Sequence, residues 1–267
     1  MPEFDQCVKP DRQVNDADGW LALLYHENSK ISSSDLLDLE ARIKEAADNP
    51  ERLRPCPAIQ PSVPRTQLPR RYWPWGIDGL IRRRRTIRHF RRGPINLHAV
   101  SRILFNASGV TQKSSGSSTS LHWPLRTAPS AGAIYPLEIR LAAMKICSLQ
   151  SGIYQYQPYE HVLELVTSDV SNGELAAASL HPDLIDQAAL AIGIFADWRR
   201  MAAKYGDRGY RYVLLEAGHM AHNIILTCSD MKLAAVPVGG FVDDDIHKVF
   251  ASPPEARPVY LIIVARQ

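Results

Sequence analysis

Seven prolines between residues 50 and 75 constrain the fold of this chain more than any other feature of its sequence. They are Pro50, Pro55, Pro57, Pro61, Pro64, Pro69 and Pro74. Proline fixes φ and lacks a backbone N–H, so neither a helix nor a central strand can run through prolines at this spacing. We therefore expect an N-terminal extension with a proline-rich connector, residues 1–75, followed by one unit of helices and strands, residues 76–267.

The hydrophobic pattern of the second part indicates helices and strands that alternate along the chain. The predicted helices are Ile77–Arg85, Leu97–Ala107 and Tyr210–Met231. The predicted strands are Glu138–Met144, Gly152–Tyr156, Leu163–Val166, Leu190–Ala196 and Val259–Val264. Residues 112–120 are rich in serine and glycine, and we expect a flexible loop there. In the extension, residues 36–47 have helical spacing, and the preceding serine run, Ser32–Ser34, is a candidate N-cap.

Charge and cysteine content argue against several classes of protein. The formal net charge is only +3 in 267 residues, which does not indicate nucleic-acid binding. The four cysteines are widely spaced, so we expect reduced, mostly buried thiols and no structural zinc site or disulfide scaffold. The N-terminus lacks the pattern of a secretory signal, and no apolar stretch is long enough to span a bilayer. We expect a cytoplasmic protein.

A strongly basic segment follows the first predicted helix of the second part. Its arginines are Arg82, Arg83, Arg84, Arg85, Arg88, Arg91 and Arg92. Three interpretations are open: a solvated charged face, a nucleic-acid patch or localisation signal, and a phosphate clamp. Arginine suits a clamp because its planar fork donates two parallel hydrogen bonds. The apolar residues Ile87 and Phe90 favour a segment that is docked on a core over a free basic tail.

Two segments of small residues would allow a ligand to approach the backbone closely. Pro129–Ala133 follows Arg126, and Pro237–Gly240 follows the long predicted helix. Taken alone, each segment is better explained by an ordinary turn. The Gly239-Gly240 pair can adopt positive φ and expose backbone N–H groups.

Lys204 and Tyr205 precede the long predicted helix, and Gly206 and Gly209 predict a flexible loop around them. A lysine in a partly desolvated pocket has a lowered pKa and can act as a general base. A neighbouring tyrosine can donate a hydrogen bond or relay a proton. By itself, however, a Lys-Tyr dipeptide indicates no function, because most such pairs are surface accidents.

The long predicted helix also carries Glu216, His219 and His222. Zinc-protease helices place their two histidines four residues apart, whereas these two are three apart. No other cluster of cysteines or carboxylates completes a site. We expect no metal ion.

Several of these segments, in this order, resemble the motifs of the nitroreductase family. Residues Arg84–Phe90 resemble the Arg-Arg-Ser-x-Arg-x-Phe opening of that family, with Thr86 in place of serine. Pro129–Pro136 and Lys204-Tyr205 resemble one branch of it, the SagB-type or azoline dehydrogenases. A fainter resemblance to SagB-type N-termini is the Tyr-His-x-x-Ser-Lys string at Tyr25–Lys30.

The resemblance implies an α+β fold with a central, mostly antiparallel sheet flanked by helices and with FMN at a homodimer interface. It implies that Lys204 and Tyr205 are catalytic and that a backbone N–H of the Gly239-Gly240 turn faces flavin N5. The flavin contacts that it implies are Arg84, Arg85, Thr86, Arg88, Pro129, Ser130, Ala131, Gly132, Pro237, Val238, Gly239, Gly240 and Arg266.

The function implied by the resemblance is FMN-dependent oxidation of thiazoline or oxazoline rings in a peptide natural product. The peptide would be free or carrier-bound, and a cyclodehydratase or synthetase would be the partner enzyme. One alternative is an NAD(P)H-dependent nitro or enone reductase, which uses the same FMN site without the Lys-Tyr pair. Another is a non-enzymatic scaffold or a nucleic-acid-binding protein. We expect neither a nucleic-acid nor a membrane partner.

Overall fold

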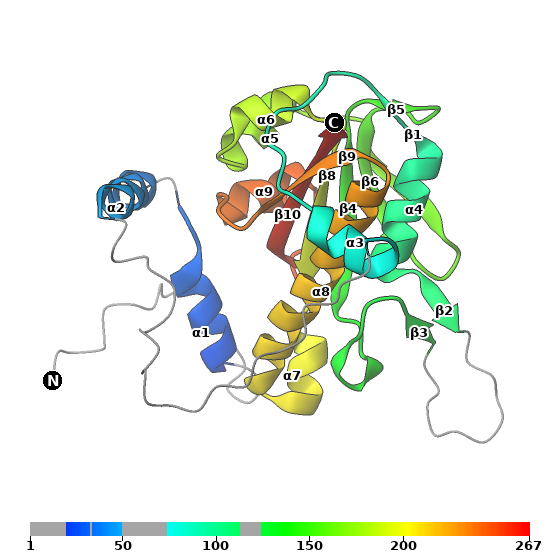
Figure 1. The fold of residues 1–267 in the computed structure, drawn as a ribbon. Coiled ribbons are helices and arrows are strands. Elements are labelled where there is room, and N and C mark those ends of the chain that lie inside the picture. The colour runs from blue at the N-terminus through cyan, green and yellow to red at the C-terminus, as the bar shows by residue number, and fades with distance from the viewer. Residues whose placement is uncertain (1–19, 33, 50–73, 113–123) are drawn as a thin grey trace, which may run out of the picture.

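The computed structural model describes residues 20–32, 34–49, 74–112 and 124–267. Its centre is a six-stranded sheet in the order β7-β6-β4-β8-β10-β9 (Figure 1), in which every neighbouring pair is antiparallel. The strands are β4 (Leu137–Ala143), β6 (Gly152–Gln157), β7 (Val162–Thr167), β8 (Leu190–Ala196), β9 (Leu233–Val238) and β10 (Arg257–Arg266). The prediction of a central, mostly antiparallel sheet is confirmed.

Helices cover both faces of this sheet and bury it from two sides. Along β8, Leu190, Ile192 and Ile194 pack into one hydrophobic cluster, while Ala191 and Phe195 pack into the other. The first cluster includes α4 (Leu97–Ser108) and α8 (Arg208–Asp230). The second includes α5 (Asn172–Ala178), α6 (Pro182–Gln187) and α9 (Asp243–Val249). Because both faces are covered, the central strands are apolar at nearly every position.

Two small sheets and four further helices complete the described chain. β1 (Ile95–Asn96) pairs in parallel with β5 (Ile146–Cys147), and β2 (Val110–Gln112) pairs antiparallel with β3 (Leu125–Arg126). The helices are α1 (Trp20–Ser29), α2 (Leu36–Asp48), α3 (Gly76–Arg83) and α7 (Arg199–Tyr205). The helix predicted over Ile77–Arg85 therefore ends two residues early, and the arginines of the basic segment from Arg84 to Arg92 are not helical.

The extension contains the predicted helix, but its predicted cap is wrong. Asp35 is the N-cap of α2, and no serine side chain caps the helix. Ser32 instead donates its backbone N–H to the Asp35 carboxylate at 2.9 Å. A carboxylate competes better than a hydroxyl for these donors because its hydrogen bonds are charge-assisted.

Some expectations fall outside the described residues. These are the connector over 50–73, most of the serine-rich loop (113–120), Cys7 and Cys56. Of the remaining cysteines, Cys228 is buried as expected, whereas Cys147 is exposed. None of the helices in the described ranges has both the length and the apolar character needed to cross a bilayer.

Candidate active site

The small-residue segment Pro129–Ala133 lies on a strained loop. Residues Ala131–Ala133 form one 3₁₀ turn, in which Gly132 has φ +61° and Ala133 has φ +53°. Tyr135 follows at φ +50°. Left-handed backbone costs a non-glycine residue on the order of 1 kcal/mol, so the surrounding contacts must enforce this path.

Hydrogen bonds within the loop and from α7 fix this conformation. The Ser130 hydroxyl accepts a hydrogen bond from the Tyr135 N–H at 2.9 Å. The Tyr135 hydroxyl accepts one from the Arg126 backbone N–H at 3.0 Å. Arg200 donates to the Tyr135 and Ile134 carbonyls at 3.1 and 2.9 Å. The loop is therefore a preorganised element, held at both ends and from one side.

A buried glutamate on α8 contacts the same loop. Glu216 is only 2% exposed, and its carboxyl group hydrogen-bonds Ser130. Burial raises the pKa of Glu216 to about 7, although the Ser130 hydrogen bond and the charges of Arg126 and Arg200 oppose this rise. A carboxyl group that titrates near neutral pH thus supports the loop.

Lys204 and Tyr205 form the last turn of α7, so the predicted flexible loop at these residues is wrong. Gly206 ends this helix with φ +55°. A methyl group placed on Gly132 would meet the Tyr205 hydroxyl at 2.6 Å and Lys204 Nζ at 2.7 Å. The two functional groups therefore converge on the backbone of Gly132, and glycine leaves room for both of them in their observed positions. The Tyr205 ring also packs edge-on against Tyr212, with 5.1 Å between centroids.

Pro237 and Val238 end strand β9, and Gly239 and Gly240 connect it to α9. Neither glycine uses its freedom to adopt a positive φ. These glycines leave space instead. A Cβ atom on Gly239 would meet nothing within 4 Å, and one on Gly240 would meet only Ile31 Cδ1 at 3.8 Å. The backbone of the turn is therefore open to a ligand.

The arginine segment after α3 is docked on the core, as its apolar residues predicted. Ile87 and Phe90 pack in the same hydrophobic cluster as Val238. The Arg91 N–H donates to the Arg266 carbonyl at 3.0 Å, which joins the segment to the end of β10. Two of the predicted phosphate contacts, the segment and Arg266, are thus brought together.

Several guanidinium groups that follow α3 have no acidic partner among the described residues. Within the described part of the chain, no carboxylate pairs with Arg84, Arg85, Arg88 or Arg266. Arg85 donates instead to the backbone carbonyls of Arg82 and Arg84, both at 2.8 Å. Unmatched guanidinium groups are the donors that suit a phosphate group. The residues present therefore fit the phosphate of FMN.

A hollow of about 500 Å³ beside this segment has a different lining. It is formed by Arg83, Arg91, Ser229, Asp230, Lys232 and Gln267. None of the predicted flavin contacts is among these residues, so the hollow is distinct from the candidate site.

The predicted site residues form two groups that a single chain keeps apart. Tyr205 and Ala131 pack against the cluster that includes α4 and α8, whereas Ile87 and Val238 belong to the cluster that includes α5, α6 and α9. In Figure 1, α7 lies at the opposite end of the molecule from α5 and α6, which the arginine segment passes. The Lys-Tyr pair with the Pro129–Ala133 loop, and the arginine segment with the Gly239-Gly240 turn, therefore form two separate groups of candidate ligand contacts, called here the two walls.

A comparison with protein families identifies the fold. Residues 81–266 match the model of the Nitroreductase family. The chain belongs to the nitroreductase family. Members of this family are oxidoreductases that typically use FMN, and the central antiparallel sheet seen here is that of the nitroreductase fold.

Individual proteins agree with this assignment. The chain is 34% identical to MJ1384 of Methanocaldococcus jannaschii, which carries the name nitroreductase, over 72% of this chain and 91% of that protein. It is 27% identical to the microcin B17-processing protein McbC of Escherichia coli, over 46% of this chain and 47% of McbC. The E. coli microcin synthetase McbBCD complex with truncated pro-MccB17 bound contains a chain that matches with a TM-score of 0.61 and 20% identity. That match covers 91% of this nitroreductase-family chain and 86% of the other, and it shows a shared fold.

Sequence analysis missed two residues that support the site. Arg200 carried no signal, because one arginine in a short helix has no distinctive spacing. Glu216 did carry one: it shares the buried face of α8 with Val213, Ala217 and Met220, where a carboxyl group is unexpected.

The histidines of the same helix have no part in this support. His219 and His222 are exposed, whereas Glu216 is buried. Across the described ranges, no group of three or more His, Cys, Asp or Glu side chains is placed to hold a metal ion.

Proposed function

We propose that this nitroreductase-family protein is an FMN-dependent dehydrogenase of the SagB type. Its substrates would be thiazoline or oxazoline rings in a peptide, which it would oxidise to thiazoles or oxazoles. The observation that carries the proposal is the convergence of Lys204 Nζ and the Tyr205 hydroxyl on Gly132. An NAD(P)H-dependent reductase has no need of this pair. Similarity to McbC, which is named for processing microcin B17, supports a peptide substrate and a synthetase partner.

The two walls would hold different parts of FMN. Arg84, Arg85, Arg88 and Arg266, with the Thr86 hydroxyl, would bind the phosphate. The open Gly239-Gly240 turn, with Pro237 and Val238 before it, would face the flavin ring, where a backbone N–H stabilises charge gained on reduction. The Pro129–Gly132 segment would contact the flavin from the other subunit.

A homodimer would bring the two walls together. Ile77 and Ile81 on α3, and Leu214 and Leu215 on α8, are all at least 40% exposed. Helix α3 packs on α8, and in the proposed dimer both helices would contribute these side chains to the subunit interface. Such side chains fit a partner subunit better than water. A second copy seated there would place its Lys204 wall against the arginine segment of the first.

In the proposed mechanism, the bound FMN supplies the two-electron acceptor for the hydride that leaves the azoline ring. Lys204 Nζ accepts the carbon-bound proton, which accounts for the second hydrogen that the ring loses. The Tyr205 hydroxyl orients the ring by a hydrogen bond. Arg200 and Glu216 keep Gly132 at the point where both side chains meet, so that the reacting groups are preorganised.

The variant Lys204→Ala tests this function. We expect it to retain FMN, and so remain yellow, while losing turnover of a thiazoline-containing peptide. Lys248→Ala is the control, since Lys248 is exposed and pairs only locally with Asp245. Normal turnover by Lys204→Ala would remove Lys204 as the base.

Two further outcomes would support the alternatives. Rapid anaerobic bleaching of the flavin by NADPH, without azoline oxidation, would favour a reductase. A protein that remained colourless after incubation with FMN would favour a non-enzymatic scaffold.

A further inference from the structure

The N-terminal segment Tyr25–Ser32, called here the strap, lies outside the matched family region yet docks next to the candidate active site. Ile31 forms a parallel bridge with Val242, and its N–H donates to the Asp243 carboxylate at 3.2 Å. Ile31 Cδ1 is also the nearest atom to the position that a Cβ on Gly240 would occupy. The strap therefore holds the chain directly after the Gly239-Gly240 turn.

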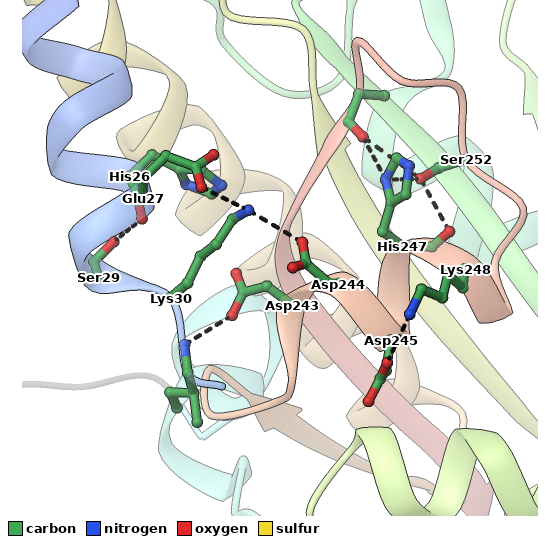
Figure 2. A network of polar contacts seen from close by, with 12 residues as sticks. His26, Glu27, Ser29, Lys30, Asp243, Asp244, Asp245, His247, Lys248 and Ser252 are labelled. Atoms are coloured by element: carbon green, nitrogen blue, oxygen red, sulfur yellow. Dashed lines mark hydrogen bonds and ion pairs between the residues drawn. The ribbon is translucent and has the colours of Figure 1, made fainter. Parts of the chain in front are cut away.

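A nearly buried ammonium group fastens the strap to α9. Lys30 Nζ lies 3.0 Å from the Glu27 carboxylate and 3.1 Å from that of Asp244, and only 12% of the Lys30 side chain is exposed. Figure 2 shows Lys30 between these two carboxylates, with Asp243 alongside and directed at the backbone of the strap. The Lys30 side chain is much less exposed than that of Lys248, at 75%, whereas its partners Glu27 and Asp244 are 36% and 69% exposed, so the burial that distinguishes this contact from the pair Lys248–Asp245 is that of the lysine alone.

The other end of the strap contacts the helix that carries the Lys-Tyr pair. The His26 side chain is 4% exposed, and its ring lies 4.4 Å from the ring of Trp198, the N-cap residue of α7. The ring of Tyr210, in the first turn of α8, packs at a tilt against Trp198 and edge-on against Tyr25, with 5.2 and 5.4 Å between centroids. One segment of eight residues thus contacts both α7 and the segment after the glycine turn.

We propose that the strap is a positioning element of the active site, which fixes the Gly239-Gly240 turn relative to α7 and depends on Lys30 for its docking. For the chemistry that it serves, this inference rests on the proposed function. Without the strap, Val242 loses its bridge and the turn samples other conformations. FMN then binds a smaller fraction of the molecules, and the flavin ring that the turn would face is no longer held at a constant position.

The test compares Lys30→Met with Lys248→Met in the full-length protein. Methionine keeps much of the apolar stem of lysine and removes the charge. We measure FMN affinity by quenching of flavin fluorescence, and hydrogen exchange over residues 237–243, both without peptide substrate. If Lys30→Met leaves only a tenth of the molecules with an ordered turn, the Kd for FMN rises about tenfold. Exchange in the turn accelerates in parallel, while Lys248→Met matches the wild type.

Kinetics with a thiazoline peptide add a readout that lost stability alone would not give. At saturating FMN, and well below the unfolding temperature, we expect Lys30→Met to lower kcat with little change in KM. If Lys30→Met does not fold, Asp244→Asn removes one of the two carboxylate partners and should shift the Kd for FMN in the same direction by a smaller factor. An FMN Kd and exchange rates equal to those of the wild type in the folded variant would overturn the proposal.

The substrate-free measurements separate this inference from the proposed function. If the wild type binds FMN but does not oxidise azolines, the proposed function fails. The Kd and exchange data still decide on the strap. If the wild type binds no FMN, hydrogen exchange alone decides: unchanged protection in Lys30→Met overturns the proposal, and faster exchange over 237–243 supports it.

Discussion

Replacement of Gly132 by alanine separates folding from function at the candidate active site. The new Cβ would lie 2.6 Å from the Tyr205 hydroxyl and 2.7 Å from Lys204 Nζ, inside the 3.4 Å at which ordinary contact begins. Both atoms are the free ends of flexible side chains, so they can retreat by roughly 0.7 Å at little cost to packing. The main cost in folding free energy is the left-handed backbone at φ +61°, about 1 kcal/mol for alanine.

The cost to catalysis should be much larger, because the displaced atoms are the proposed reacting groups. A misplacement approaching 1 Å can lower a rate by about 100-fold, equivalent to roughly 2.7 kcal/mol in the activation barrier. We therefore expect Gly132→Ala to remain folded and yellow while kcat for a thiazoline peptide falls by about two orders of magnitude.

Gly76→Ala provides the matched control. Gly76 has φ +64°, and a Cβ there would meet nothing within 4 Å, so this variant reports the backbone cost alone. Thermal unfolding and stopped-flow reduction of the flavin measure the two effects separately. If Gly132→Ala turned over as fast as Gly76→Ala, the convergence of Lys204 and Tyr205 on this glycine would have no catalytic meaning.

Three further predictions concern pH dependence and cofactor binding. Burial, and then the charge of Lys30, lowers the pKa of His26 to about 4, so its stabilising contribution is present above pH 6.5 and is lost as the pH falls towards 4. His26→Phe should remove this loss of unfolding free energy, which is at most roughly 3 kcal/mol. Urea titrations at several pH values measure it, and an acid dependence equal to that of the wild type would refute the prediction. Burial raises the pKa of Glu216 to about 7, so the contribution of its carboxyl group to folding stability is present below pH 4.5 and is lost as the pH rises through 7. Glu216→Gln should flatten this decline in stability. A pH dependence of stability like that of the wild type would contradict the assignment. Arg88→Met should raise the Kd for FMN by roughly 10- to 100-fold in a fluorescence titration while Arg92→Met changes it little, and equal effects would mean that the segment acts only through its overall charge.

Elements with clean periodicity were predictable from the sequence. Strand β8 has the predicted bounds, Leu190–Ala196, because all seven of its residues are apolar and buried by helices on both faces. The long helix, predicted over Tyr210–Met231, is found at Arg208–Asp230 because apolar residues recur along one face. In both cases local preference and tertiary burial agree.

The missed elements are those in which tertiary context overrides local signals. Strand β9 contains Pro237, which suggested a turn, but β9 is at the edge of the sheet, where a missing N–H is tolerated. Helix α7 has only seven residues, too few for a periodic pattern, and Gly206 after it suggested a loop. Packing against α8 stabilises this helix, and a single sequence does not encode that contact in any local pattern.

The sequence motifs predicted candidate site residues, but they did not predict which of these residues lie together in the folded chain. Nothing local predicts that Lys204 and Tyr205 meet the backbone of Gly132, which is about 70 positions earlier in the printed sequence. The resemblance implied FMN at a homodimer interface without saying which subunit supplies the Lys-Tyr pair, and a single chain holds this pair and the arginine segment on opposite faces of the sheet. The proposed mechanism therefore relies on the dimer that we propose.

The most direct test of the proposed function is to mix the FMN-loaded protein anaerobically with a peptide that carries one thiazoline ring. Absorbance follows the flavin, and mass spectrometry follows the peptide. The expected result is one bleached flavin for each thiazole formed, with the peptide lighter by two hydrogen atoms. A flavin that stays oxidised in the presence of the peptide, but is bleached at once by NADPH, would contradict the proposed dehydrogenase.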